Sequence, residues 1–282
     1  MEKAILVFQT DFTYKEGAVC SMYGVVKSVD RSLEIITGTH DIPQFDTWSA
    51  SYRLYQSMKF WPEGTVFVSV VDPGVGTPRK ASVALTNNGY YIVTPDNGSL
   101  THVDKEFGIK EIREIDENVN RLKGKDTEEV SIFHGRDLFG FCAAKLASGI
   151  ISFQEVGPAY SKDEIVRFPI LNPTIEGGNT IKGIFEINDP NFGNLWTNIP
   201  LSVFKKAGFE FGDYLDLRIC HKGVEKFSEK LLFHKSFGFA EKGAPVIYNN
   251  ELMKISLAVS QGSFCEKYGI DYGSDWTVEF RK

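Results

Sequence analysis

The chain has 282 residues, of which 42% are hydrophobic and 24% charged, and its formal net charge at pH 7 is −6. These proportions are typical of a globular protein and exclude a disordered, collagen-like or disulfide-miniprotein chain. The negative charge argues against a nucleic-acid partner, because non-specific binding to phosphate backbones needs a basic face.

Cysteine spacing and hydropathy exclude several further classes. The apolar run 4–8 is too short for the core of a signal peptide, and no stretch reaches the ~20 apolar residues of a membrane-spanning helix. The five histidines show no metal-ligand spacing. Four distant cysteines form no Cys-x-x-Cys pair, namely Cys20, Cys142, Cys220 and Cys265. We therefore expect a cytoplasmic protein with no metal site and no membrane partner.

The first half of the chain alternates strand and helix patterns. An apolar run at 3–9 ends at the polar pair Thr10-Asp11, as a buried strand does. The alternation predicts an α/β domain in which helices layer a central sheet. In chain order the expected elements are strand 3–9, helix 17–29, strand 33–36, helix 46–60, strands 65–71, 82–85, 90–93 and 111–115, and helix 137–147.

After about residue 165 helical periodicity becomes scarce and short strand patterns predominate. We expect a smaller all-β domain over 180–282, an N-terminal domain with the catalytic residues over 1–167, and a linker over 168–179 that contains two prolines and a Gly-Gly pair. The expected strands of the second domain are 181–187, 196–199, 214–219, 246–248 and 254–259.

Polar residues gather where predicted strands end, which is where ligands bind in open α/β sheets. Asp11 follows the first strand, and its carboxylate is suited either to a sugar diol or to a helix cap. The stiff loop 72–79 carries Asp72 and Arg79 seven residues apart, which predicts either a small-ligand site or an ion-paired turn. Arg79 stands where two phosphate-binding motifs need glycine, so neither motif is present.

Two other segments carry chemistry-bearing side chains. His134 precedes a predicted helix, where it is a general base, an orienting partner or an ordinary loop residue. The segment 188–198 combines amides, an acid and aromatic rings. This combination suits a purine base, which is recognised by stacking and by hydrogen bonds to its edge, and it also suits a turn between strands.

Five motifs taken together resemble one family. They are TDF…EG at 10–17, VVDPGVGTPR at 70–79, TPDNG at 94–98, FHGRD at 133–137 and NDPNFGNLWTN at 188–198. Their order and spacing over essentially the whole chain are similar to those of the S-adenosyl-L-methionine (SAM) hydrolases, also called SAM hydroxide adenosyltransferases. These enzymes are relatives of the fluorinating and chlorinating SAM enzymes.

The resemblance implies a fold, an assembly and a reaction. It implies an N-terminal α/β domain, a barrel-like C-terminal domain, and a homotrimer whose sites lie between the first domain of one subunit and the second domain of its neighbour. The implied reaction is hydrolysis of SAM to adenosine and L-methionine, in which a water-derived oxygen attacks ribose C5′. No cofactor is implied, since SAM is the substrate.

The resemblance also implies roles for individual residues. The catalytic set falls on Asp72, Arg79 and His134, and the ribose-binding acid on Asp11. The methionine end falls on Glu16, Gly17 and Ala18, although Glu16 stands where the family has Asp, and Phe45 stands where the halogenating relatives carry Trp. The remaining implied substrate contacts are Gly135, Asp189, Phe192, Asn194, Phe237, Glu251, Val259 and Gln261, and the segment 250–253 departs from the family's pattern.

Two other functions are compatible with the same fold. A SAM-dependent halogenase needs a small pocket of hydrogen-bond donors for its halide, and the carboxylate of Asp72 would repel that ion. A non-catalytic SAM or adenosine sensor would keep Asp11, Asp189 and Asn194 but would have no use for Asp72, Arg79 and His134 together.

Overall fold

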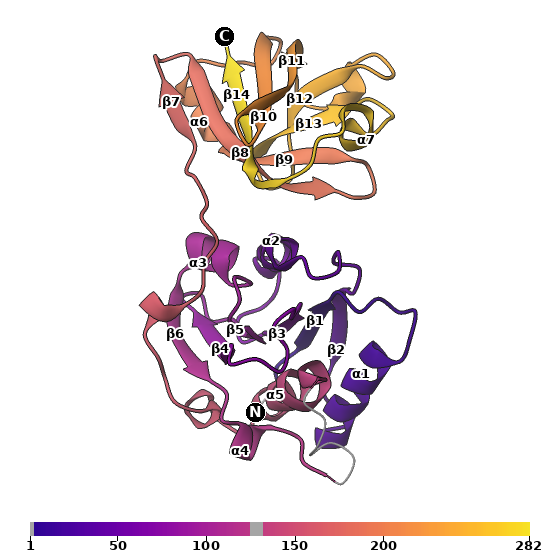
Figure 1. Ribbon diagram of the computed structural model, residues 1–282, viewed down its shortest axis with the longest axis vertical. Helices are drawn as coiled ribbons and strands as arrows, with labels where there is room; N and C mark the ends of the chain where they lie inside the picture. The colour runs from indigo at the N-terminus through magenta and orange to yellow at the C-terminus, as the bar shows by residue number, and fades with distance from the viewer. Residues whose placement is uncertain (1–2, 125–131) are drawn as a thin grey trace. The chain divides into compact units, whose positions relative to one another are not determined.

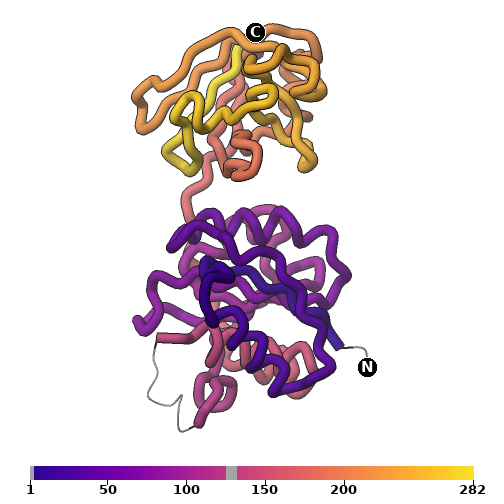
Figure 2. The backbone as a smooth tube through the Cα atoms, turned by 90° about the vertical axis from the view of Figure 1, so that its right-hand side faces the viewer, coloured from indigo at the N-terminus to yellow at the C-terminus, as the bar shows by residue number. Residues whose placement is uncertain are grey.

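The computed structural model describes residues 3–124 and 132–282. The chain forms two compact units, Met1–Phe168 (the N-terminal unit) and Pro169–Lys282 (the C-terminal unit). The backbone passes from the first to the second only once (Figure 2).

The N-terminal unit is built on a mixed sheet with the strand order β2-β1-β3-β5-β4-β6. The four strands β2, β1, β3 and β5 run parallel to one another, whereas β4 runs antiparallel to β5 and β6. All residues of β1 and β3 are buried, as expected for central strands covered on both faces. The strands are β1 (Leu6–Thr10), β2 (Ile35–Thr39), β3 (Val66–Val70), β4 (Ala81–Thr86), β5 (Tyr91–Pro95) and β6 (Ile109–Glu114).

Helices cover both faces of this sheet (Figure 1). Leu6 and Phe8 of β1 share a core with Met22 of α1 and Ala143 of α5, so these helices cover one face, while α2 and α3 pack together on the other. The helices are α1 (Ala18–Val29), α2 (Thr47–Met58), α3 (Thr101–Phe107), α4 (Glu117–Asn120), the π-helix Gly135–Gly140 that continues into α5 (Phe141–Ala147), and the 3₁₀ turns Phe153–Val156 and Lys162–Glu164. The predicted α/β class is confirmed.

The C-terminal unit is a closed β-barrel. Within the residues described, seven strands follow one another in the order β14-β10-β11-β12-β13-β9-β8, and antiparallel pairing of β14 with β8 closes the ring. The predicted β-class of this region is confirmed. Strand β7 lies inside the predicted linker segment and pairs with β8. The strands are β7 (Thr174–Glu176), β8 (Thr180–Asp189), β9 (Asn194–Pro200), β10 (Tyr214–His221), β11 (Val224–Phe233), β12 (Pro245–Asn249), β13 (Lys254–Val259) and β14 (Gly273–Arg281).

The interior of the barrel is filled by aromatic and aliphatic side chains, among them Phe204, Phe233 and Phe280. The ring centroid of Phe204 lies 5.1 Å from that of Phe233 and 5.0 Å from that of Phe280 in edge-to-face geometry, the arrangement that aromatic pairs prefer. The helices of this unit are α6 (Leu201–Lys206), α7 (Phe264–Tyr268) and the 3₁₀ turn Phe237–Phe239, and α6 and α7 contribute Phe204 and Phe264 to the interior. In the part of the chain that the structure describes, no helix combines the length and apolarity needed to cross a bilayer.

Candidate active site

The sheet brings two acidic residues to one edge. Strands β1 and β3 are parallel neighbours with Thr10 opposite Val70, so Asp11 and Asp72 both follow carboxyl ends at that edge. Burial raises the pKa of Asp11 above its usual value, a hydrogen bond from the backbone of Phe45 opposes this rise, and the negative charge of Asp72 adds to it. The two carboxylates therefore influence each other across the strand ends.

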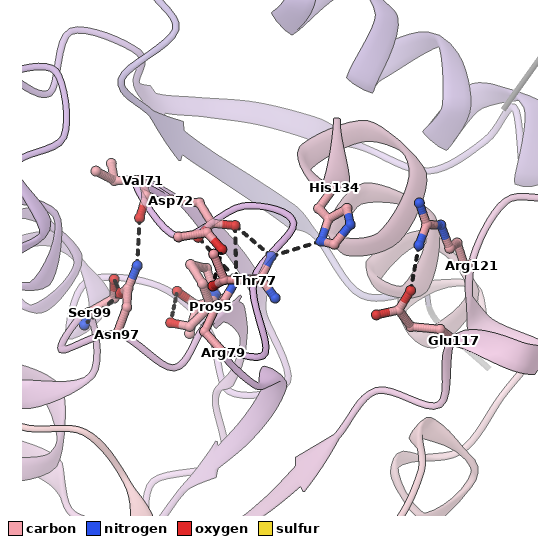
Figure 3. Close-up of polar contacts among 12 residues, drawn as sticks. Val71, Asp72, Thr77, Arg79, Pro95, Asn97, Ser99, Glu117, Arg121 and His134 are labelled. Atoms are coloured by element: carbon pink, nitrogen blue, oxygen red, sulfur yellow. Dashed lines mark hydrogen bonds and ion pairs between the residues drawn. The ribbon is translucent and has the colours of Figure 1, made fainter. Parts of the chain in front are cut away.

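Asp72 and Arg79 form a two-pronged ion pair (Figure 3). Nε of Arg79 donates to Oδ1 and Oδ2 of Asp72 at 3.0 and 3.1 Å, and Nη2 donates to Oδ2 at 2.6 Å. The side chain of Arg79 is only 10% exposed and that of Asp72 only 6%. The turn between them is closed by Thr77, whose N–H and hydroxyl both donate to the carbonyl of Gly74. The ion-paired turn, one of the two alternatives for the loop 72–79, is thus present. The ion pair is also compatible with the other alternative, a site for a small ligand.

Arg79 also connects the pair to His134. Its Nη2 donates to Nδ1 of His134 at 2.8 Å, and because a guanidinium only donates, Nδ1 must accept and a neutral ring carries its proton on Nε2. Burial lowers the pKa of His134, and the positive charges of Arg79 and Arg121 lower it further. Asp72, Arg79 and a neutral His134 therefore form one connected group.

One nitrogen of the guanidinium remains available to a ligand. Within residues 3–124 and 132–282, no group accepts a hydrogen bond from Nη1 of Arg79. The guanidinium carbon lies 5.2 Å from the ring centroid of Phe139, which supports the cation from the π-helix side. Two N–H donors of a fixed cation can thus be offered to a small oxygen ligand.

The segment around His134 packs onto the loop that carries Asp11. The rings of Phe12 and Phe133 meet edge to face at 6.0 Å. A Cβ at Gly135 would approach the Phe12 ring to 3.1 Å, so glycine permits the close contact between the loop after β1 and the start of the π-helix. This packing fixes His134 relative to Asp11.

Phe45 and Asp11 are joined through the backbone. The N–H of Phe45 donates to Oδ2 of Asp11 at 2.9 Å. Phe45 has a left-handed backbone, with φ of +65°, and its ring is 61% exposed. A non-glycine residue in this conformation stores strain, which proteins tend to keep at functional sites. The left-handed backbone and the exposed ring are both compatible with a role in ligand binding.

The segment 16–18, which the resemblance assigns to the methionine end of SAM, lies at the start of α1. Oε1 of Glu16 accepts a hydrogen bond from the N–H of Ala18 at 3.0 Å, and Gly17 is the N-cap residue of the helix. Glu16 therefore satisfies a backbone donor of the first turn in addition to any contact it makes with a ligand.

The C-terminal unit holds a cavity of about 630 Å³ that collects five of the predicted contacts, namely Phe192, Asn194, Phe237, Val259 and Gln261. Asp189 and Glu251 are not among its lining residues. Asp189 instead shapes the turn, since its carbonyl accepts the N–H of Gly193 at 2.7 Å and its side chain that of Asn191 at 3.2 Å. A Cβ at Gly193 would lie 1.9 Å from Oγ of Ser263, so only glycine fits there. Pro190 and Asn191, from the segment 188–198 that suits a purine base, also line the cavity. Lys242, Ser260 and Glu266 line it as well and were not predicted as individual contacts.

The TPDNG motif at 94–98 is part of the resemblance, but no functional role was assigned to its residues. In the structure it contacts Val71, the residue before Asp72. The side chain of Asn97 donates to the carbonyl of Val71 at 2.9 Å. Apart from the motif itself, nothing in the sequence pointed to this contact.

Among the residues described, no three His, Cys, Asp or Glu side chains are grouped so as to hold a metal ion.

Fold and site define a two-domain protein in which an α/β unit carries a carboxylate–guanidinium–imidazole group and a β-barrel carries a second cavity. Residues 6–157 match the family model of the SAM hydroxide adenosyltransferase N-terminal domain, and residues 185–277 match that of the C-terminal domain. The chain belongs to the SAM hydroxide adenosyltransferase family.

Relatives with different activities resemble the chain equally well. A protein of Methanocaldococcus jannaschii named (R)-S-adenosyl-L-methionine hydrolase is 31% identical over 95% of this chain and 93% of its own length. A protein of Actinoplanes sp. named fluorinase is 30% identical over 97% of both chains. A crystal structure of an uncharacterized conserved protein from Thermotoga maritima superposes with a TM-score of 0.87 at 33% identity, over 99% of this chain and 100% of that one. Overall identity therefore does not separate hydrolysis from halogenation.

Proposed function

We propose that this protein hydrolyses SAM to adenosine and L-methionine. In the reaction a water oxygen forms a bond to ribose C5′, the C5′–S bond breaks, sulfur keeps its electron pair, and one proton leaves the water. The observation that carries the proposal is the connected group of Asp72, Arg79 and His134, which offers a fixed cation and a carboxylate to one oxygen.

The chemistry of the sulfonium explains why this group is suitable. The positive charge of SAM disappears as the C–S bond breaks, so the leaving sulfur needs no acid. The enzyme has to hold one oxygen in line with that bond, and such positioning can supply several kcal/mol of barrier reduction. The donors on Nη1 of Arg79 can bind that oxygen, and the guanidinium charge favours its hydroxide-like form.

The hydrogen bonds suggest how the proton is handled. Nδ1 of His134 is occupied by Arg79, so in this arrangement His134 orients the guanidinium. The Asp72 carboxylate has lone pairs beyond those that Arg79 uses. In the proposal Asp72 therefore accepts a hydrogen bond from the water and takes its proton first, and His134 can take it at Nδ1 once Nη2 turns to the oxygen.

Substrate binding is divided between two clusters. Asp11 accepts hydrogen bonds from the ribose hydroxyls, Phe45 packs against the ligand, and the segment 16–18 holds the methionine end. The cavity with Phe192, Asn194 and Phe237 is large enough for an adenine ring and offers aromatic faces and an amide. Because these clusters lie in different units, we propose, following the resemblance, a homotrimer in which neighbouring subunits complete each site.

The test is incubation of the purified protein with SAM in oxygen-18 water that contains chloride and fluoride, followed by chromatography and mass spectrometry. The expected products are methionine and adenosine labelled at the 5′ oxygen. A 5′-halo-5′-deoxyadenosine would assign the protein to the halogenating branch instead. Intact SAM that nevertheless binds would favour a sensor, and the proposal would be abandoned.

A further inference from the structure

We propose that Asn97 is a positioning residue, which holds the loop carrying Asp72 and Arg79 in its active geometry by hydrogen bonding the carbonyl of Val71. This inference rests on the proposed function, since it assigns Asn97 a part in the same reaction. Asn97 contacts neither Arg79 nor His134 through a hydrogen bond and acts through the backbone that precedes Asp72.

The turn that contains Asn97 is attached to both ends of the loop, and Figure 3 shows its contact with Val71. At the start of the loop, Nδ2 of Asn97 donates to the carbonyl of Val71 at 2.9 Å. At its end, the N–H of Asp96 donates to the carbonyl of Lys80 at 2.9 Å. Val71 and Lys80 directly flank the segment that begins with Asp72 and ends with Arg79. The sheet already holds both ends of the loop near β5, because β3 and β4 both pair with that strand. Two consecutive residues of the turn after β5 add one further contact to each end, at Val71 and at Lys80.

The amide of Asn97 is held in a single orientation. Its Oδ1 accepts a hydrogen bond from Oγ of Ser99 at 2.6 Å, and Ser99 is fully buried. A serine hydroxyl that donates to Oδ1 leaves Nδ2 to face Val71. Ser99 thus fixes which end of the amide meets the loop.

The turn is itself anchored on the side away from the loop. Asp96 is 5% exposed, and its two carboxylate oxygens accept hydrogen bonds from the hydroxyl of Tyr160 at 2.9 Å and from the N–H of Val166 at 3.0 Å. Because these partners come from a distant segment of the N-terminal unit, the turn is a fixed support. Removal of the Asn97 bond should therefore shift the loop and leave the turn in place.

The chemistry of the contact requires a donor at position 97. Aspartate has nearly the same shape as asparagine, but it would place a carboxylate oxygen against the carbonyl oxygen of Val71 and repel it. The start of the loop would move away, and with it Asp72. Since a displacement of about 1 Å at reacting groups can cost about 100-fold in rate, a change that leaves the substrate-binding clusters untouched should act on turnover.

The experiment compares Asn97→Asp with wild type and with Asn87→Asp. Asn87 is a matched control, because its Nδ2 also donates to a backbone carbonyl, that of Phe107, at 3.0 Å in the same unit. For each protein we would measure kcat and KM for SAM hydrolysis, and the imidazole ¹⁵N signals of His134, assigned through His134→Gln. The ¹⁵N signals report whether Nδ1 still accepts from Arg79, and they do not depend on any reaction.

In Asn97→Asp we expect kcat to fall at least about tenfold with KM changed less than about threefold, together with an altered Nδ1 signal. Asn87→Asp should keep both readouts. Unchanged kcat and ¹⁵N signals in Asn97→Asp, or equal losses in Asn87→Asp, would overturn the inference. If Asn97→Asp does not fold, Ser99→Ala takes its place. This variant keeps the amide of Asn97 but removes the hydroxyl that orients it. We then expect the same changes in kcat and in the ¹⁵N signals, with a smaller loss of kcat. If wild type does not hydrolyse SAM, the proposed function fails, and the ¹⁵N signals alone decide on Asn97.

Discussion

His40 makes the N-terminal unit sensitive to acid, and this sensitivity can be predicted quantitatively. Its ring is 1% exposed and lies between the hydroxyl of Thr10, 2.8 Å from Nδ1, and the hydroxyl of Tyr23, 2.8 Å from Nε2. These contacts join the end of β1, directly before Asp11, to helix α1. Burial lowers the pKa of His40 from 6.5 to about 4.

The sign of the effect follows from proton binding in the two states. Between about pH 6.5 and 4 the unfolded chain binds a proton at this position and the folded chain does not, so the free energy of unfolding falls as the pH falls. A shift from 6.5 to about 4 corresponds to about 3 kcal/mol, since each pKa unit is worth about 1.4 kcal/mol. This contribution is fully present above about pH 7 and is lost near pH 4.

Urea unfolding of wild type and His40→Gln, repeated between about pH 7.5 and 4.5, tests this prediction. At neutral pH the variant should be less stable by about 1–2 kcal/mol, because its hydrogen bonds are imperfect. Its stability should nevertheless depend much less on pH, and the lowered pKa of His134 should leave part of the dependence in place. As a control, His221→Gln changes a histidine of the C-terminal unit that stacks on Trp276 and makes none of the contacts of His40. The reasoning fails if His40→Gln loses stability on acidification as steeply as wild type.

Four further substitutions test the site directly. Asp72→Ala and His134→Ala should each cut turnover strongly while SAM affinity, measured by calorimetry, stays within about tenfold, because both act in the chemical step; normal turnover in both would remove them from the mechanism. Asp11→Asn should weaken adenosine binding by about 1–3 kcal/mol, the usual cost of a charge-assisted hydrogen bond, and an unchanged dissociation constant would exclude its ribose role. Phe45→Gly should stabilise the fold by about 1 kcal/mol by relieving the left-handed backbone but weaken SAM binding; unchanged SAM binding in this variant would show that the ring does not contact the ligand.

Buried strands were predictable from sequence, and strands with one solvated face were less so. The apolar run at 65–71 contains β3, and the run at 3–9 covers β1 except its last residue, Thr10; all residues of both strands are buried. Strand β11, Val224–Phe233, was missed. Its outward positions carry charged residues, and two of its three buried residues, Phe227 and Leu231, are four apart, which is a helical spacing. Only pairing with β10 and β12 makes this segment a strand.

The candidate site divides in the same way. The pairing of Asp72 with Arg79 could be anticipated, because an eight-residue loop with two glycines and two prolines keeps both ends close. The contact between Arg79 and His134 spans 55 residues, and no local pattern predicts it; the resemblance alone placed them together. The contact of Asn97 with Val71 could not be predicted from the sequence either, because the side chain of an asparagine in a turn has many possible acceptors.

The charge balance of the site bears on the choice between water and halide. Asp72 and Arg79 form a pair with no net charge and little solvent access. Because the pKa of His134 is lowered, its ring stays neutral and adds no positive charge. Burial raises the pKa of Asp11, and the nearby charge of Asp72 adds to this rise. A halide would meet the donors of Arg79 but also a carboxylate, whose repulsion is strong where water is excluded. Water uses both halves of the pair, since it accepts from the guanidinium and donates to the carboxylate. The arrangement therefore favours a nucleophile that has a proton to lose.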